Sequence, residues 1–175
     1  MLIEYSMTTV PAPPADIDAE NCHHIMTARA YNAETNDTMA TCELYFVDFT
    51  NGMKVTDCHD LLDVDGITYE FASLFSAEFE LTDEVAEKLD HYYPIHRLVI
   101  IHALKVGKEH QGNTLSKALI DDVERRFICD TDLLALKAYP LENNTPETTE
   151  SLAKYYESIG FQRTGVNDIL TKPQI

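Results

Sequence analysis

The chain has 175 residues, of which 30 are Asp or Glu and 13 are Lys or Arg, so its net charge is −17. A surface this acidic repels phosphate backbones, and we therefore expect no direct nucleic-acid binding. Apolar residues make up 45% of the chain, which is ordinary for a globular protein. No apolar run reaches the length of about 18 residues that a membrane span needs, so we expect no membrane association.

The acidic residues are concentrated in the first half of the chain. Residues 1–93 hold 19 acidic and 3 basic residues, whereas residues 94–175 hold 11 and 10. One explanation is a solvated acidic surface; another is that the first half attracts a cationic ligand while the second half hosts an anionic one. We expect a single domain over 1–175, with an irregular N-terminal segment over 1–21 and the acidic half over 22–93.

The cysteines and histidines indicate neither disulfides nor a metal. The four cysteines are Cys22, Cys42, Cys58 and Cys129. They form no Cys-x2-Cys pair and no export signal precedes them, so we expect reduced thiols and a cytoplasmic location. Cys22-His23 and Cys58-His59 are poor chelators, because adjacent residues of a strand point to opposite faces. We expect no bound metal.

The first half is predicted to be mainly β-structure. Its expected strands are Leu2–Met7, His24–Tyr31, Thr38–Phe49 and Ile67–Phe71. The second and third are rich in β-branched and aromatic residues and are separated by turn residues, which predicts an antiparallel pair. Asn51-Gly52 and Asp65-Gly66 are turn signals. A helix is predicted after Thr82, its N-cap, and before Pro94.

The second half alternates strands and helices. Its expected elements are the strand Arg97–Val106, the helix Asn113–Phe127, the strand Asp132–Tyr139, a helix from Pro146 to Gly160, and the strand segments Phe161–Thr164 and Asp168–Thr171. Arg97–Val106 is apolar on both faces, which predicts a central strand covered on both sides. Thr145 is the expected N-cap of the later helix. The fold class is therefore α/β (α+β) with a mixed sheet.

The loop after the central strand has the properties of a phosphate site. It runs from Gly107 to Gly112 and leads directly into a helix. The first amides of a helix lack carbonyl partners and lie at the positive end of the helix dipole. Gly112 permits a close approach of the backbone. These features predict an anion site at the start of the helix.

Two motifs in this half resemble those of the GNAT superfamily of acyl-CoA-dependent N-acyltransferases. The stretch from His102 to Leu119 resembles its acyl-CoA motif, a strand followed by (Gln/Arg)-x-x-Gly-x-(Gly/Ala) and an apolar helix. Tyr156-Glu-Ser-Ile-Gly160-Phe161 matches its second signature, Tyr-x-x-x-Gly-Phe. The resemblance covers about residues 95–172. It departs from the common form at Glu109, where Gln or Arg is usual, and at Thr114, where Gly or Ala is usual.

The resemblance implies a GNAT-like, mainly antiparallel sheet that is flanked by helices and splayed at the central strand. It also implies acetyl-CoA as co-substrate, bound by residues 94–175, with residues 22–93 on the acceptor side. The backbones of Leu104 and Val106 would pair with the pantetheine. The amides expected to face the pyrophosphate are those of Gln111, Gly112, Asn113, Thr114, Leu115 and Ser116.

Direct attack of an amine on a thioester requires a base for the ammonium proton and an acid for the leaving thiolate. The resemblance places Tyr156 as the acid, with Tyr155 as its competitor. His102 is the base candidate, because a histidine side chain exchanges protons near neutral pH. The rival bases are Glu70, Glu78 and Glu80.

Together, these residues indicate an N-acetyltransferase that transfers the acetyl group of acetyl-CoA to a primary amine of a cationic small molecule, or to a protein lysine or N-terminus. Two alternatives remain open. One is a catalytically inactive GNAT-fold protein that binds a basic protein partner through its acidic face. The other is an acidic mimic that occupies a nucleic-acid-binding protein. The resemblance also suggests a homodimer.

Overall fold

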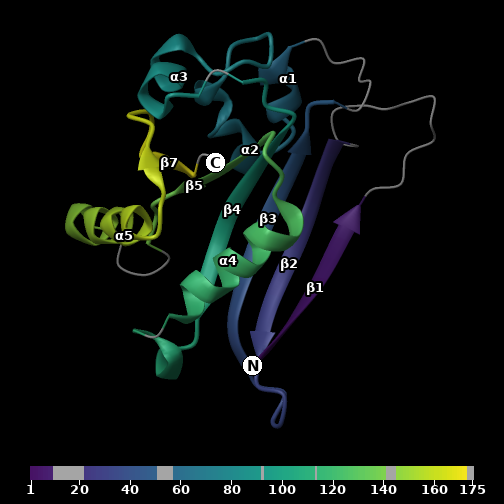
Figure 1. Cartoon of the computed structure of the whole chain (residues 1–175), viewed down its shortest axis with the longest axis vertical. Helices are drawn as coiled ribbons and strands as arrows, with labels where there is room; N and C mark the ends of the chain where they lie inside the picture. The colour runs from purple at the N-terminus through teal and green to yellow at the C-terminus, as the bar shows by residue number, and fades with distance from the viewer. Residues whose placement is uncertain (10–21, 51–56, 92, 113, 141–144, 173–175) are drawn as a thin grey trace.

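The protein is built around one mixed sheet. The computed structural model describes residues 1–9, 22–50, 57–91, 93–112, 114–140 and 145–172. The sheet has seven strands in the order β1-β2-β3-β4-β5-β7-β6, of which β4 and β5 are parallel and the other neighbours antiparallel (Figure 1). The strands are β1 (Leu2–Thr9), β2 (His23–Tyr31), β3 (Thr38–Asp48), β4 (Arg97–Val106), β5 (Asp132–Lys137), β6 (Gln162–Arg163) and β7 (Ile169–Lys172).

Helices cover both faces of this sheet. They are α1 (Cys58–Leu62), α2 (Gly66–Tyr69), α3 (Asp83–Leu89), α4 (Leu115–Phe127), α5 (Pro146–Ser158) and the short 3-10 helices η2 (Ala72–Leu74) and η3 (Lys108–His110). Figure 1 shows α4 lying across β2 to β4, α5 beside β5 and β7, and the helices α1 to α3 gathered at one end of the sheet. Among the described residues, no helix is long and apolar enough to cross a membrane.

The alternation of side chains along the central strands creates two cores. Val99 and Ile101 of β4 belong to the core under α4 and α5, whereas Leu98 and Ile100 belong to the core under α1, α2 and α3. β5 divides in the same way: Leu134 and Leu136 face α4 and α5, whereas Leu133 and Ala135 face the other side of the sheet. Because successive residues of a strand point to opposite faces of the sheet, alternate residues of β4 and β5 pack into different cores.

Most predicted elements are confirmed. The antiparallel pair forms as β2 and β3, and the N-terminal strand extends to Thr9, so this part of the segment 1–21 is regular rather than irregular. The central strand has the predicted bounds, but only Leu98–Ile101 is buried on both faces, and His102 begins an exposed end. The turn Asn51-Gly52 lies outside the described residues.

The predicted strand Ile67–Phe71 is wrong, because its first residues form α2. The side chain of Asp65 accepts hydrogen bonds from the backbone N–H groups of Ile67 and Thr68, both at 2.8 Å. This is the geometry of an N-cap, which satisfies donors that a helix leaves without partners. The Asp-Gly pair that suggested a hairpin turn therefore starts a helix, and local capping overrides the β propensity of the residues that follow.

Candidate functional site

The sheet opens where β4 and β5 separate. Their parallel pairing ends at Ile101 and Leu136, but β4 continues for five residues beyond that point, to Val106. On its other side β4 stays paired with β3, with a bulge at His102: Glu43 faces Ala103, whereas Leu44 faces Ile101. A cleft of about 800 Å³ fills the opening between β4, the end of β5 and α5. This is the splay at the central strand that the resemblance implies.

The cleft leads to the predicted acyl-CoA residues. Leu104, Val106 and Gln111 line it, and the Gln111 side chain donates a 3.4 Å hydrogen bond to the Val106 carbonyl. Beyond Ile101 the edge of β4 that faces β5 has no strand partner among the described residues, so an extended ligand can pair there, at Val106 only by displacing the Gln111 side chain from the carbonyl. Gly112 has a φ of +78°, which favours glycine, and a Cβ there would meet nothing within 4 Å.

The helix α4 begins at the expected phosphate site. Its N-cap is Thr114 and its first turn begins with Leu115 and Ser116, so the amides of this turn have no carbonyl partner within the helix. Asn113 lies outside the described residues. Glu109 is not among the residues that line the cleft; its side chain is 81% exposed and approaches the His110 ring at 3.6 Å. Its charge is thus directed into water, where it is screened.

Two neighbouring tyrosines of α5 line the cleft. Tyr156 is buried, and its ring packs against Phe161 with centroids 5.7 Å apart. Burial, followed by the electrostatic effects of Cys42 and Tyr155, raises the pKa of Tyr156 well above its usual range, so this phenol stays protonated. Tyr155 lies 5.4 Å away and shares a 2.5 Å hydrogen bond with the Ser116 hydroxyl. Tyr155 therefore joins α5 to the first turn of α4, whereas Tyr156 keeps an available proton beside the cleft.

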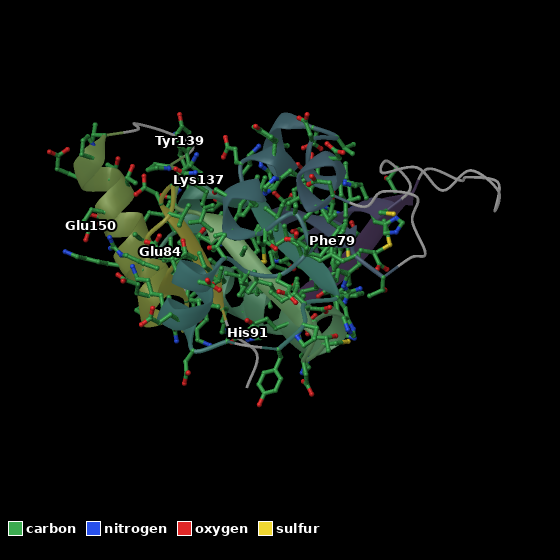
Figure 2. The ribbon with its side chains drawn as sticks, turned by 90° about the horizontal axis from the view of Figure 1, so that it is seen from above. Phe79, Glu84, His91, Lys137, Tyr139 and Glu150 are labelled. Carbon is green, nitrogen blue, oxygen red and sulfur yellow. The ribbon has the colours of Figure 1, made fainter. Side chains whose placement is uncertain are left out.

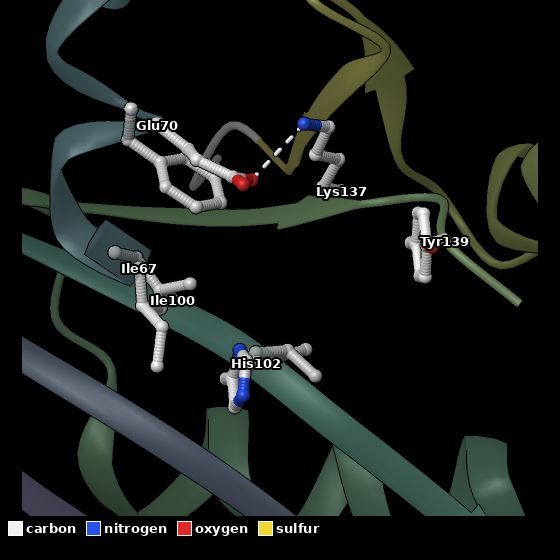
Figure 3. A pocket seen from close by; sticks show the side chains of 8 residues that line it. Ile67, Glu70, Ile100, His102, Lys137 and Tyr139 are labelled. Atoms are coloured by element: carbon white, nitrogen blue, oxygen red, sulfur yellow. Dashed lines mark hydrogen bonds and ion pairs between the residues drawn. The ribbon is translucent and has the colours of Figure 1, made fainter. Parts of the chain in front are cut away.

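A second cavity, of about 410 Å³, lies between β4, the end of β5 and the segment that carries α2 (Figure 3). It meets the cleft at four shared lining residues: Ile101, His102, Lys137 and Tyr139. The His102 ring packs edge-on against Tyr45, and its Nε2 lies 3.9 Å from the Glu43 carboxylate. The bulge in β4 thus places the candidate base at the junction of two cavities, partly exposed and close to an acidic group.

The wall of the second cavity carries an ion pair. Lys137 Nζ lies 3.0 Å from Glu70 Oε2. Glu70 follows α2 directly, so the Asp65 cap fixes its place. Of the three rival bases, Glu70 lines this cavity, whereas Glu78 and Glu80 line neither this cavity nor the cleft.

The sequence interpretation missed Lys137 and Tyr139 as site residues. Both are labelled in the view from above (Figure 2), at and just beyond the end of β5. The alternation of side chains along β5 could have predicted the position of Lys137. It lies two and four residues after Ala135 and Leu133, so its side chain is on the same face of the sheet. That face is the one covered by α2.

Removing the Asp65 cap is expected to disturb this wall. In Asp65→Ala, the free energy of unfolding should fall by about 1 kcal/mol, because two backbone donors lose their acceptor. Glu70 should also lose its fixed position opposite Lys137. Asp65→Asn is the matched control, since asparagine caps nearly as well. Urea unfolding measures the loss; equal stability of the two variants would show that the cap does not hold α2.

The histidines of the Cys22-His23 and Cys58-His59 dipeptides each lie within hydrogen-bond distance of a backbone carbonyl. His23 Nε2 lies 2.9 Å from the Leu61 carbonyl, and His59 Nε2 lies 3.0 Å from the Phe75 carbonyl. Burial, followed by a neighbouring acidic group, raises the pKa of Cys42 and of Cys58 to about 12. No group of three or more His, Cys, Asp or Glu within the described ranges is arranged to hold a metal ion.

Comparisons with known proteins find likeness at the level of structure. No protein-family model and no curated protein matches the sequence. The fold is similar to one in a KacTA–DNA complex, with 12% identity, 85% of this chain and 67% of that chain covered, and a TM-score of 0.45. It is also similar to AtaT complexed with acetyl-methionyl-tRNAfMet, with 14% identity, 87% and 71% covered, and a TM-score of 0.44.

A third similar structure is a Corynebacterium glutamicum acetyltransferase related to histone acetyltransferase HPA2, with 12% identity, 88% and 66% covered, and a TM-score of 0.42. At identities this low we infer function only from this chain's own residues. The described sheet is mixed and mainly antiparallel, with helices on both faces and a free end of β4. It therefore agrees with the GNAT-like sheet that the resemblance of the sequence motifs implies.

Proposed function

We propose that the protein is an N-acetyltransferase that uses acetyl-CoA as co-substrate. The observation that carries this proposal is the free end of β4. It lines a cleft that contains Tyr156 and meets a second cavity at His102, and Tyr155 of the same cleft bonds to Ser116 in the first turn of α4. One ligand with an extended arm and an anionic end suits the cleft, and a second ligand suits the other cavity.

The proposed acid and base serve different ligands: Tyr156 lies in the cleft for acetyl-CoA, and His102 lies where the cleft meets the second cavity. Acetyl-CoA supplies an activated thioester: the amine nitrogen bonds to its carbonyl carbon, the carbon–sulfur bond breaks, and the products are an amide and the free thiol of CoA. His102 takes the proton that the acceptor's ammonium group must lose before attack. Tyr156 gives its proton to the leaving sulfur; the attacking nitrogen loses its second proton to the solvent as the amide forms, and the solvent returns a proton to Tyr156. The Glu43 carboxylate lies 3.9 Å from Nε2 of the His102 ring.

The proposed acceptor is a primary amine, of a cationic small molecule or of a protein lysine or N-terminus. Residues 1–93 supply the acidic side chains Glu43 and Glu70 around the second cavity. Their charge attracts an ammonium group and raises its local concentration. We also propose a cytoplasmic location, on the basis of the expected reduced thiols, and a homodimer, on the basis of the resemblance. The negative charge disfavours direct nucleic-acid binding.

The first test is acetyl-CoA binding by calorimetry at moderate salt, with free adenine nucleotide as the control. We expect micromolar binding by the parent protein. Thr114→Glu should weaken it at least tenfold, since the new carboxylate suits the start of α4 but repels a pyrophosphate there. Ser6→Glu, which adds the same charge on the exposed strand β1, should bind as the parent does.

An amine screen with the parent and His102→Ala then follows. Failure of acetyl-CoA to bind at several hundred micromolar would overturn the transferase proposal. It would favour instead the inactive GNAT-fold protein that binds a basic partner through its acidic face. That alternative predicts salt-dependent binding to a basic protein, unchanged by substitution of Tyr156.

A further inference from the structure

The second cavity presents two opposite charges above an apolar floor. Glu70 and Lys137 face each other at 3.0 Å on one wall, opposite Ile100 and His102 (Figure 3). The floor is apolar, and Ile100 is almost completely buried beneath it. The cavity thus combines a carboxylate, an ammonium group and hydrocarbon within a space suited to a small ligand.

Lys137 is the informative member of this pair. A cavity built for a purely cationic acceptor needs carboxylates alone, and a lysine on its wall repels such a ligand. The alternation of β5 points Lys137 toward α2, on the side of Ala135, rather than into the solvent. The Lys137 and Glu70 side chains are still 33% and 49% exposed, so a ligand that enters the cavity can contact both.

We propose, on the basis of the proposed function, that the acceptor is not a purely cationic amine but a zwitterionic α-amino acid with an apolar side chain. Its ammonium group binds Glu70, its carboxylate binds Lys137, and its side chain packs against Ile67, Phe71 and Ile100. Each charge of the ligand then meets an opposite charge, and the ammonium group lies in the cavity that contains His102.

The net charge of the protein agrees with this assignment. A zwitterion carries no net charge, so the net charge of −17 does not oppose its approach to the cavity. Lysine and N-terminal amines of proteins carry no adjacent carboxylate. If such an amine binds Glu70, it supplies no negative charge to replace Glu70 beside Lys137. The cavity therefore distinguishes a free amino acid from an amine within a polypeptide.

The test compares three acceptors of the same hydrocarbon shape at saturating acetyl-CoA: L-leucine, L-leucinamide and 3-methylbutylamine. We expect kcat/KM for leucine to exceed that for leucinamide by at least about tenfold, since a charge-assisted hydrogen bond contributes about that factor. In Lys137→Met this preference should vanish through a higher KM for leucine, and in Lys137→Arg it should persist. Lys154→Met, on the exposed face of α5, should keep the parent's preference.

Binding of leucine without acetyl-CoA separates this inference from the transferase proposal. If acetyl-CoA fails to bind but calorimetry detects leucine, and Lys137→Met abolishes it, the transferase proposal falls and the cavity assignment stands. If acetyl-CoA binds and leucinamide is acetylated as well as leucine, the assignment is overturned and the transferase stands. A loss of the same size for both acceptors in Lys137→Met also overturns it, as does the absence of leucine binding at ten millimolar.

Discussion

Replacing Asp132 with alanine is expected to lower the free energy of unfolding by about 3 kcal/mol, because it leaves a partly buried arginine without its partner. Asp132 is only 4% exposed, and its carboxylate accepts hydrogen bonds from Arg97 at 2.5 and 3.2 Å and from the Cys129 N–H group at 2.8 Å. Arg97 also donates to the Phe127 carbonyl at the end of α4. Asp132 therefore connects α4 to the first pair of the parallel ladder.

Asp130→Ala is the matched control for this substitution. It removes the same group from an exposed position two residues away, so its effect should stay within about 0.5 kcal/mol. Urea unfolding followed by circular dichroism gives both values. A loss below about 1 kcal/mol for Asp132→Ala would contradict the prediction, since that is the range of an exposed ion pair.

Replacing Tyr156 with phenylalanine is expected to lower kcat by about 100-fold if this phenol protonates the leaving thiolate. Dissociation of acetyl-CoA should change by less than about threefold, because the ring and its packing against Phe161 remain. Since burial raises the pKa of Tyr156 above its ordinary value of 10.0, the acid stays protonated up to at least pH 10. The parent should therefore show no loss of kcat from this group between pH 7 and pH 10.

Tyr155→Phe separates catalysis from positioning. It removes the hydroxyl that bonds to Ser116 at the start of α4, so it should weaken acetyl-CoA binding a few-fold and leave kcat nearly unchanged. Steady-state kinetics and calorimetry on both variants measure the two effects. A larger fall of kcat in Tyr155→Phe than in Tyr156→Phe would reverse the two roles.

Local signals in the sequence determined the elements on which the site is built. Thr145 and Pro146 begin α5, and the Thr145 and Thr148 side chains form a capping box. The run Leu98–Ile101 gave a central strand, because a segment that is apolar on both faces must be covered on both sides. The glycine loop before α4 gave the candidate phosphate site. Each of these features depends on residues close together in the chain.

The turn pattern Asp65-Gly66 predicted the wrong element at α2, and no local pattern indicated that Lys137 belongs to the site. Asp65-Gly66 fits either a hairpin turn or a helix cap, and the choice depends on whether the residues after it find a strand partner. In the folded chain Phe71 packs instead into the core under α1, α2 and α3. That packing brings Glu70 to Lys137, 67 residues away in sequence.

The sequence by itself determined the strands and helices of the second half, the antiparallel pair of the first half, the acidic charge and the motifs that resemble GNAT proteins. Only the tertiary structure decided which groups share a cavity: the bulge that places His102 between two cavities, the burial of Tyr156, and the ion pair between Glu70 and Lys137. The reason is physical. Capping and periodicity act within one element, whereas a site is formed where separate elements pack, and their contacts are set by the whole sheet.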